Sequence, residues 1–406
     1  MPLVLKVCGG TWENASRDKR ELSTYRECGA DVAVLAKGNR NDKGRIEMVD
    51  GFTVYRYSTR PLGCKAPDLL NRLISLFTWT KFVKSLDPDV VSGHDLIPGL
   101  TISWMATLFS KQKPKLVYDA HEYEIGRNVK RSSLEAWAIK HWEKFLIDRC
   151  AYTIMVNDSI ADEVQHIHDI KERPVVVRST PNLWNIDTEK CQNIRRQLME
   201  ELAGKSRGIK MKDSIDYNKP SEREPFLVMY HGTLTTGRGI ETLIRLTSIN
   251  THVYGIILGN GDEKYIERLH HMAAEMKVEQ RVLFHPAVPI AELWKYVGAV
   301  DLSLMMIQGY AKSYYYSLPN KFFESIQALT PIVASSFPEM KRLIDQYEIG
   351  LTCDPEDLDA INCCVEKMRT DTAFYMMCKH NLVKAKHDLC WEKEKQVLID
   401  AFRLIG

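Results

Sequence analysis

The feature that most constrains the fold is a recurring alternation of short apolar runs with longer segments of helical spacing. Leu3 to Cys8 is such a run, and because it is rich in β-branched and apolar residues and ends in Gly9-Gly10 it predicts a buried strand. Further runs of this kind follow in the first half, at 31–36, 52–57, 89–91, 115–118 and 152–156. Strands that alternate with helices predict a parallel sheet covered by helices, which is an α/β fold.

The same alternation begins again in the second half. Phe226 to Tyr230 predicts a buried strand, a helix follows from Ile240, and later runs at 253–258, 281–284 and 301–305 predict more strands. Residues 204–225 are charged and aperiodic, which predicts a flexible loop before this series. We therefore expect two Rossmann-like domains, at 1–182 and 183–385, with parallel sheets facing a central cleft. A last helical segment occupies 386–406.

Composition excludes several classes of protein. A net charge of +2 argues against a dedicated nucleic-acid binder, which usually carries a strong basic excess. The longest uncharged run, between Asp95 and Lys111, is too short to span a bilayer, and no secretory signal precedes the first strand. Ten cysteines without a C-x-x-C pair favour a reducing compartment. We expect a cytoplasmic protein, with contact to the inner face of a membrane as an open alternative.

The stretch 314–331 carries the first candidate site. Asn320 and Lys321 stand at the predicted start of a helix, where free N–H groups and the helix dipole favour an anion. Glu324 follows one turn later and suits a ligand with hydroxyls beside phosphate, such as a nucleotide ribose. The alternative is an ordinary amphipathic helix with an exposed Lys–Glu pair.

Predicted strand ends supply the other candidates. Residues 231–239 form a glycine-containing turn between a strand and a helix, so a phosphate cradle is possible there, although no Lys-Ser/Thr pair makes it a Walker loop. In the first half, Gly9-Gly10, His94-Asp95 and 119–122 all fall at strand ends, where ligands of such sheets bind. His121 is the preferred candidate among them. The alternative is a buried histidine satisfied by backbone.

Two predicted helices interleave basic and aromatic residues, a pattern that can rest on an anionic membrane surface. The alternative is a buried aromatic stripe with a solvated basic edge. The residues are Phe77, Trp79, Lys81, Phe82 and Lys84 in one helix, and Arg127, Lys130, Arg131, Trp137, Lys140, Trp142, Lys144 and Phe145 in the other.

Taken in order, several short strings resemble the nucleotide-sugar glycosyltransferases of the two-Rossmann-domain (GT-B) type, most closely the retaining family 4. The matching strings are Gly9-Gly10, DPDVVSGHD at 87–95, YDAHEYE at 118–124, VVRSTPNL at 176–183, YHGTLTTGRGIETL at 230–243, ILGNGDE at 257–263, RVLFHPAVP at 281–289 and LPNKFFES…TPIVAS at 318–335. The resemblance implies that the first domain faces the acceptor, that the second binds the donor, and that the last helix crosses back to the first.

The resemblance also implies roles for single residues. Arg238 and Lys321 would neutralise the donor diphosphate as catalytic cations, and Glu324 would hold the ribose hydroxyls. His121 would lie near the transferring sugar, and Gly10 would let the first domain approach the phosphates. The base would contact the loop from His285 to Val288, and Gly232, Thr233 and Asn320 would complete the donor site.

Two positions depart from the family pattern. Thr233 stands where many members carry a second arginine, and Tyr316 stands where the first carboxylate of E-x₇-E would fall. The implied reaction is transfer of a UDP- or GDP-linked sugar to a hydroxyl of a glycan, glycolipid or other acceptor, with retention. No cofactor or metal is expected. A sugar-nucleotide 2-epimerase and an inactive sugar-nucleotide-binding subunit remain alternatives.

Overall fold

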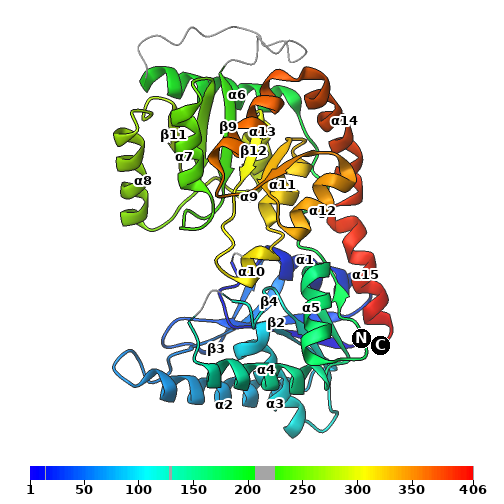
Figure 1. Ribbon diagram of the computed structural model, residues 1–406. Coiled ribbons are helices and arrows are strands. Elements are labelled where there is room, and N and C mark those ends of the chain that lie inside the picture. The colour runs from blue at the N-terminus through cyan, green and yellow to red at the C-terminus, as the bar shows by residue number, and fades with distance from the viewer. Residues whose placement is uncertain (14, 128–129, 206–224, 406) are drawn as a thin grey trace. The chain divides into compact units, whose positions relative to one another are not determined.

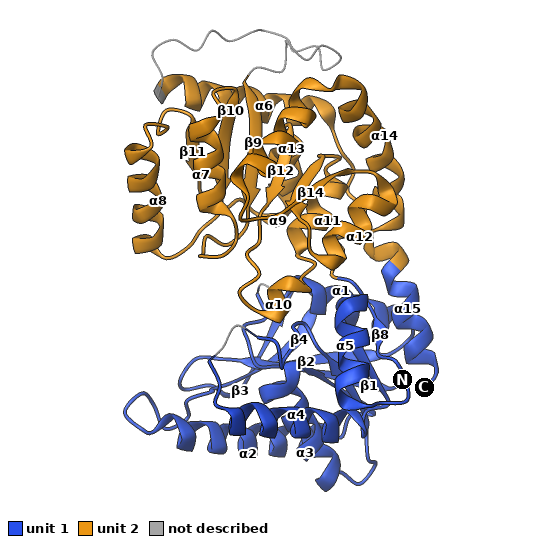
Figure 2. Cartoon of the chain, in the orientation of Figure 1, with its two compact units in different colours: residues 1–178, 394–406 blue, residues 179–393 orange. Residues whose placement is uncertain are grey.

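The computed structural model describes residues 1–13, 15–127, 130–205 and 225–405. The chain divides into two compact units, one of residues 1–178 with 394–406 and one of residues 179–393 (Figure 2). The divisions fall at 178/179 and 393/394, against the expected 182/183 and 385/386. Most of the expected loop at 204–225 lies outside the described residues.

Unit 1 is built on a sheet of eight strands in the order β3-β4-β2-β1-β5-β6-β7-β8 (Figure 1). Its strands pair in parallel, except that β3 runs antiparallel to β4. β3 was not expected from the sequence, because its side chains are mostly exposed and give no apolar run. The strands are β1 (Leu3–Cys8), β2 (Asp31–Lys37), β3 (Lys43–Val49), β4 (Phe52–Tyr57), β5 (Val90–His94), β6 (Lys115–Asp119), β7 (Tyr152–Met155) and β8 (Val175–Val176).

Helices lie on both faces of this sheet. α2 and α3 pack on the central strands through a core that includes Leu5, Val91 and Trp79. On the other side, Tyr25 of α1 lies against Phe402 of α15, with ring centroids 4.8 Å apart. The helices of unit 1 are α1 (Ser16–Glu27), α2 (Asp68–Leu86), the π-helical turn η1 (Asp95–Leu100), α3 (Thr101–Phe109), α4 (Ser133–Ile147), α5 (Asp158–His168) and most of α15 (Trp391–Arg403).

Unit 2 holds a fully parallel sheet of six strands in the order β11-β10-β9-β12-β13-β14. Its central strand, β9, is buried along its whole length, as a continuous apolar run in a parallel sheet predicts. The strands are β9 (Phe226–His231), β10 (Val253–Leu258), β11 (Val282–His285), β12 (Leu302–Met305), β13 (Ile332–Ser335) and β14 (Gly350–Cys353). The helices are α6 (Thr188–Lys205), α7 (Ile240–Ile249), α8 (Glu263–Glu275), α9 (Ile290–Val297), α10 (Lys312–Tyr315), α11 (Asn320–Gln327), α12 (Pro338–Tyr347), α13 (Leu358–Thr370) and α14 (Thr372–Asp388).

The expected α/β architecture with two parallel-sheet domains is confirmed. The C-terminal segment differs in detail, because α14 ends at Asp388 and α15 begins at Trp391, so the expected single helix is two. From Glu394 onward the chain belongs to unit 1, where the carboxylate of Glu394 pairs with Arg178 at 2.8 Å.

No helix in the described part of the chain combines the length and the apolar character needed to cross a bilayer. All ten cysteines are free thiols.

Candidate functional site

The glycine turn of unit 2 follows β9 and has a backbone that only glycine adopts easily. Gly232, Gly237 and Gly239 all have positive φ, and a Cβ on Gly239 would lie 2.5 Å from the carbonyl oxygen of Met306. The turn is held by the next strand's loop, since the Leu234 amide donates to the Asn260 carbonyl at 2.8 Å. A rigid, glycine-lined backbone therefore sits at the carboxyl end of the central strand.

Lys321 lies at the start of α11 and is the most unusual side chain of this unit. It is 8% exposed, and its Nζ has no hydrogen-bond partner among the described residues. The nitrogen lies 3.9 Å from the centroid of the Tyr230 ring, a cation–π contact. Burial and the charge of Arg238 lower the pKa of Lys321 to about 7, although Glu324 opposes them. The amine of Lys321 is therefore buried without a hydrogen-bonded anion to neutralise its positive charge.

Arg238 belongs to the glycine turn and is half-buried. Its guanidinium lies over the ring of Tyr314, 4.9 Å from the ring centroid, and among the described residues it forms no ion pair with a carboxylate. The charge of Arg238 helps to lower the pKa of Lys321, so the two cations influence each other electrostatically. Two cations without carboxylate partners of their own favour a multiply charged anion.

Glu324 lies one turn further along α11 and is positioned by a residue that the sequence analysis gave no role. His231, the last residue of β9, places its Nε2 3.0 Å from Oε2 of Glu324. His231 is buried, whereas the Glu324 side chain is 15% exposed. The carboxylate is thus held by His231 and remains partly exposed.

The expected base-binding loop follows β11. His285 ends the strand, and its Nδ1 lies 2.7 Å from the Pro286 carbonyl oxygen. The Ala287 amide donates to Oδ1 of Asn260 at 3.0 Å, which ties this loop to the loop after β10. Val288 is half-buried. The loop therefore presents backbone groups at the same strand ends as the glycine turn.

The remaining predicted residues of unit 2 are more open. Gly232, Thr233 and Asn320 are exposed, and the Thr233 carbonyl accepts a hydrogen bond from the Tyr230 hydroxyl at 2.7 Å. Asn320 is the first residue of α11, whereas Pro319 stands at the N-cap. Ser317, three residues before this helix, donates its hydroxyl to the Tyr314 carbonyl and does not cap the helix.

In unit 1 the predicted strand ends do meet. Cys8 pairs with His94 and His94 with Asp119 in the strand registers, so β1, β5 and β6 end side by side. The His121 ring stacks on the His94 ring with centroids 3.7 Å apart, and its backbone amide donates to Asp95. Its Nε2 lies 2.8 Å from Oδ2 of Asp119, so a carboxylate holds the ring, not backbone. Burial lowers the pKa of His121, but Asp119 and Asp18 outweigh it and raise the pKa.

Behind His121 lies a fully buried cluster of charges. Lys6, in the middle of β1, contacts Asp119 and lies 3.0 Å from Asp18 and 2.8 Å from Glu21. Arg17 pairs with Glu21 and Asp119 as well. The carboxylates outweigh the cost of burial and keep the pKa of Lys6 well above its usual value. A lysine inside an apolar strand is the signal that could have revealed this cluster.

Two trios within the described residues bring potential metal-ligand atoms together: Cys8 with Asp18 and His94, and Asp18 with Asp119 and His121. The ammonium of Lys6 already contacts both aspartates. A second cation there would meet this charge, so the cluster suits an internal ion pair better than a metal.

Gly10 follows β1 and is exposed. A Cβ at this position would meet nothing within 4 Å, and its φ is not in the positive range, so the fold itself does not require glycine here. By contrast, a Cβ on Gly9 would lie 2.5 Å from Cδ of Pro98. The fold thus leaves room for a side chain at position 10.

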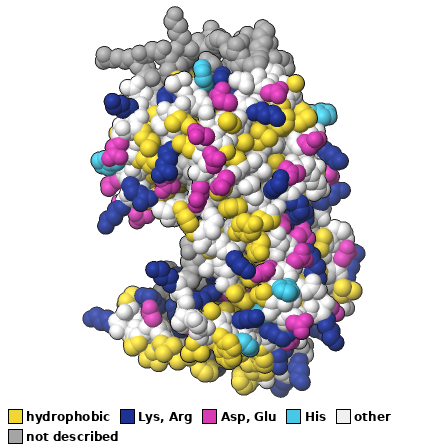
Figure 3. All heavy atoms as spheres, in the orientation of Figure 1, with side chains coloured by type: hydrophobic (Ala, Val, Ile, Leu, Met, Phe, Trp, Pro, Cys, Tyr) yellow, Lys and Arg dark blue, Asp and Glu magenta, His cyan; other side chains and the backbone are white. Residues whose placement is uncertain are grey.

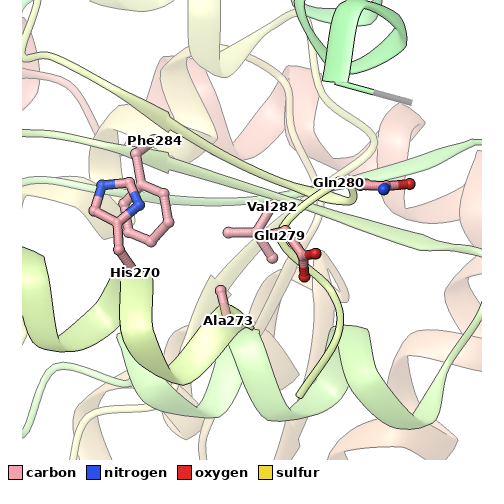
Figure 4. Close-up of a pocket in the computed structure, with 6 residues that line it drawn as sticks. All are labelled: His270, Ala273, Glu279, Gln280, Val282 and Phe284. Atoms are coloured by element: carbon pink, nitrogen blue, oxygen red, sulfur yellow. The ribbon is translucent and has the colours of Figure 1, made fainter. Parts of the chain in front are cut away.

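Unit 2 also has a pocket of about 370 Å³ between α8 and β11, in which the His270 and Phe284 rings face each other (Figure 4). It is lined by His270, Ala273, Glu279, Gln280, Val282 and Phe284. None of these is a predicted site residue, and Glu279 and Gln280 precede β11. The pocket thus lies along the edge strand β11 and shares no lining residue with the glycine turn or with α11.

Comparisons with known proteins agree with this geometry. Residues 22–181 match the model described as Glycosyltransferase Family 4, and residues 211–384 match the one described as Glycosyl transferases group 1. An uncharacterized glycosyltransferase of Methanocaldococcus jannaschii is 24% identical over an aligned length of 425, and the match covers 98% of each chain. The lipopolysaccharide core biosynthesis glycosyltransferase LpsE of Rhizobium meliloti is 22% identical over 279 residues, covering 68% of this chain and 76% of that one.

The fold is also similar to that of HepE from Anabaena, in a crystal structure with UDP-glucose. The TM-score is 0.72 at 15% identity, and the match covers 99% of this chain and 100% of that chain.

Proposed function

Because this chain belongs to the family 4 type of glycosyltransferases with a GT-B fold, we propose that it moves a sugar from a nucleoside-diphosphate sugar to an acceptor hydroxyl. The observation that carries the proposal is the Lys321 ammonium, buried without a partner beside Arg238 at the start of α11. A donor diphosphate would supply the missing negative charge to both side chains and to the free N–H groups of the helix.

The donor is a UDP- or GDP-sugar in this proposal. The open carboxylate of Glu324, fixed by His231, would accept hydrogen bonds from the ribose hydroxyls. The loop from His285 to Val288 would meet the base. That HepE has been crystallised with UDP-glucose supports UDP as the first nucleotide to test.

In the reaction, negative charge develops on the β-phosphate oxygen as the bond to the sugar breaks. Arg238 and Lys321 would stabilise that charge, and loss of one such preorganised donor typically lowers the rate on the order of 100–1000-fold. These cations would do this work without a bound metal. We propose retention by front-face attack, with the leaving phosphate helping to accept the proton of the acceptor hydroxyl. His121 would contact the reacting sugar or its acceptor.

The acceptor is a glycan, a glycolipid or another lipid-linked saccharide, and the enzyme would reach it as a peripheral protein at a membrane surface. The relation to LpsE, which bears a role in lipopolysaccharide core biosynthesis in its name, supports this class of acceptor. Nothing in the comparisons points to a sugar-nucleotide 2-epimerase.

A ligand panel followed by product analysis tests the proposal. UDP, GDP, ADP and CMP are compared by thermal shift, since a ligand at 100 times its Kd stabilises the native state by about 2.7 kcal/mol. The matching sugar nucleotides are then incubated with candidate acceptors. We expect a new glycoside and a free nucleoside diphosphate. An epimerised donor, or tight binding without turnover by the wild type, would contradict a transferase.

A further inference from the structure

The outer surface of three helices in unit 1 is unusually apolar. α2, α3 and α4 expose eight large hydrophobic side chains, with Phe77 65% and Trp137 59% exposed. Figure 3 shows hydrophobic side chains gathered over this part of unit 1, with basic side chains beside them. We call these eight residues the apolar face: Leu69, Leu70, Leu73 and Phe77 of α2, Leu108 and Phe109 of α3, and Leu134 and Trp137 of α4. Contiguous exposed apolar surface of this kind marks an interaction site.

The three helices form one layer. α2 and α3 lie on the same side of the sheet, where Trp79 and Ile102 enter one core. α4 joins α3 through Trp142, whose Nε1 donates to the Thr101 hydroxyl at 3.0 Å and whose ring lies against Trp104. The inward residues are therefore already used in packing, and the apolar face is additional to what the fold requires.

The spacing on α2 makes the exposure systematic. Leu69, Leu73 and Phe77 stand four residues apart, so they form one line along the outside of the helix. Lys81 continues that line one turn later, and it is exposed. Apolar side chains ending in a basic residue are typical of helices that lie in a membrane interface.

The charge around the apolar face has one dominant sign. Along α2, α3 with its following loop to Lys115, and α4, eight basic residues stand among three acidic ones. Two more acidic residues border these helices: Asp87 follows α2, and Asp148 follows α4 and pairs with Lys144 at 3.6 Å. Of the acidic residues, Glu143 is buried, where it accepts from Tyr118, and Glu135 is engaged by Ser132 in the capping box of α4. The basic residues are Arg72, Lys81, Lys84, Lys111, Lys113, Lys115, Lys140 and Lys144.

We propose that this face docks on an anionic lipid bilayer, with the apolar face in the interface and the lysines at the headgroups. Exposed tryptophan and phenylalanine suit the boundary between headgroups and acyl chains, and basic side chains are attracted to anionic lipids. A second copy of the chain fits less well, because two copies joined through this face would bring like charges together. The bilayer would be the surface on which the transferase proposed above meets its acceptor. Only this role rests on the proposed function, whereas the docking itself does not.

Sedimentation of the full chain with lipid vesicles tests the proposal without donor or acceptor. Vesicles of phosphatidylcholine with phosphatidylglycerol are compared with vesicles of phosphatidylcholine alone, at low and high salt. We expect the protein to pellet with the anionic vesicles and to be released by salt, since screening weakens its attraction to them. Recovery in the supernatant with both kinds of vesicle would overturn the proposal.

A triple variant tests the face itself. Leu73→Ser, Phe77→Ser and Trp137→Ser together should lower binding to anionic vesicles about tenfold or more, because the buried apolar area drives insertion. The matched control removes three exposed apolar side chains of unit 2 helices, Ile249→Ser, Met376→Ser and Val383→Ser, and should bind as the wild type does. Circular dichroism and thermal unfolding verify that both variants fold.

Unchanged vesicle binding by the Leu73/Phe77/Trp137 variant would overturn the assignment. So would a wild-type dimer in analytical ultracentrifugation that this variant abolishes, because the face would then belong to a second copy. Nucleotide binding by the same variant should equal that of the wild type. Loss of membrane binding and failure of the transferase proposal are thereby separate results.

Discussion

The ammonium nitrogen of Lys321 lies 3.9 Å from the centroid of the Tyr230 ring, with no hydrogen-bond acceptor in reach among the described residues. Tyr230 is on the central strand of unit 2 and Lys321 is at the start of α11. The ring face stabilises the charge only partly, so burial and Arg238 together lower the pKa of Lys321 to about 7. The lowered pKa of Lys321 would make the affinity for a diphosphate depend on pH.

Affinity for UDP should fall as pH rises above about 7. A diphosphate favours charged Lys321, so above the pKa of the free protein, binding must take up a proton, which weakens it by up to about tenfold per pH unit. Below that pKa the lysine is already charged and contributes no slope. Calorimetry from pH 6 to 9, in buffers of different ionisation enthalpy, measures affinity and proton uptake. Lys321→Met is the control, and a slope unchanged by it would contradict this assignment.

The lowered pKa of Lys321 also affects the stability of the ligand-free protein. Between about pH 7 and the usual value of 10.5, the unfolded chain holds a proton on this lysine that the native protein lacks. The free energy of unfolding therefore rises with pH in this window through Lys321. Comparing denaturation curves of wild type and Lys321→Met at pH 6.5 and 9 measures it. Lys321→Met removes the buried amine, so it should be more stable than the wild type at pH 6.5. This difference in stability should shrink at pH 9.

Glu324→Gln should weaken the binding of UDP but leave unchanged the binding of an analogue that lacks the ribose hydroxyls. An amide oxygen can still accept from His231, so the side chain stays in place, while its negative charge is lost. A hydrogen bond to a charged group contributes about 1.5–3 kcal/mol, which corresponds to about 10–100-fold in Kd. Titration with UDP and with 2′,3′-dideoxyuridine diphosphate gives the comparison. Equal losses for the two ligands would place Glu324 elsewhere than at the ribose.

Lys6→Met should strongly destabilise unit 1. The variant would leave three buried carboxylates with Arg17 as their main cation, those of Asp18, Glu21 and Asp119. Breaking a buried ion pair typically costs about 3–5 kcal/mol of stability. Without Lys6 the carboxylate pKa values rise in the folded state, so the native protein binds more protons than the unfolded chain. The loss of stability should therefore be largest near neutral pH and shrink toward pH 4. Urea denaturation at pH 7 and 4.5 measures this, and an equal loss at both would contradict it.

Gly239→Ala and Gly10→Ala form a matched pair. At Gly239, with φ near 85°, the added methyl would meet the Met306 carbonyl, so we expect a loss of about 1–2 kcal/mol or more. At Gly10 the methyl meets open space, and stability should stay within about 0.5 kcal/mol of wild type. If donor phosphates approach Gly10, turnover should nevertheless fall. Wild-type turnover by Gly10→Ala would refute that role.

The strand ends were predictable because an apolar run and the turn after it are both local in sequence. Leu3 to Cys8, Phe52 to Tyr57 and Val253 to Leu258 were delimited correctly. The antiparallel β3 was not found, because an exposed edge strand needs no apolar pattern. The break between α14 and α15 was missed for a similar reason, since Leu389 and Cys390 continue the apolar spacing while the backbone leaves the helix.

Sequence alone determined the class of fold, the two series of strands, and the residues placed at their ends, because periodicity and turn chemistry act between neighbours. Tertiary structure decided which side chains face one another. His231 and Glu324 are 93 residues apart, and Lys6 and Asp119 are 113 apart. Parallel strands bring residues that are distant in sequence to a common edge of the sheet. Only the register of the strands and the burial of the side chains determine that Glu324 pairs with His231 and stays partly exposed, while Lys321 is buried without a hydrogen-bonded anion.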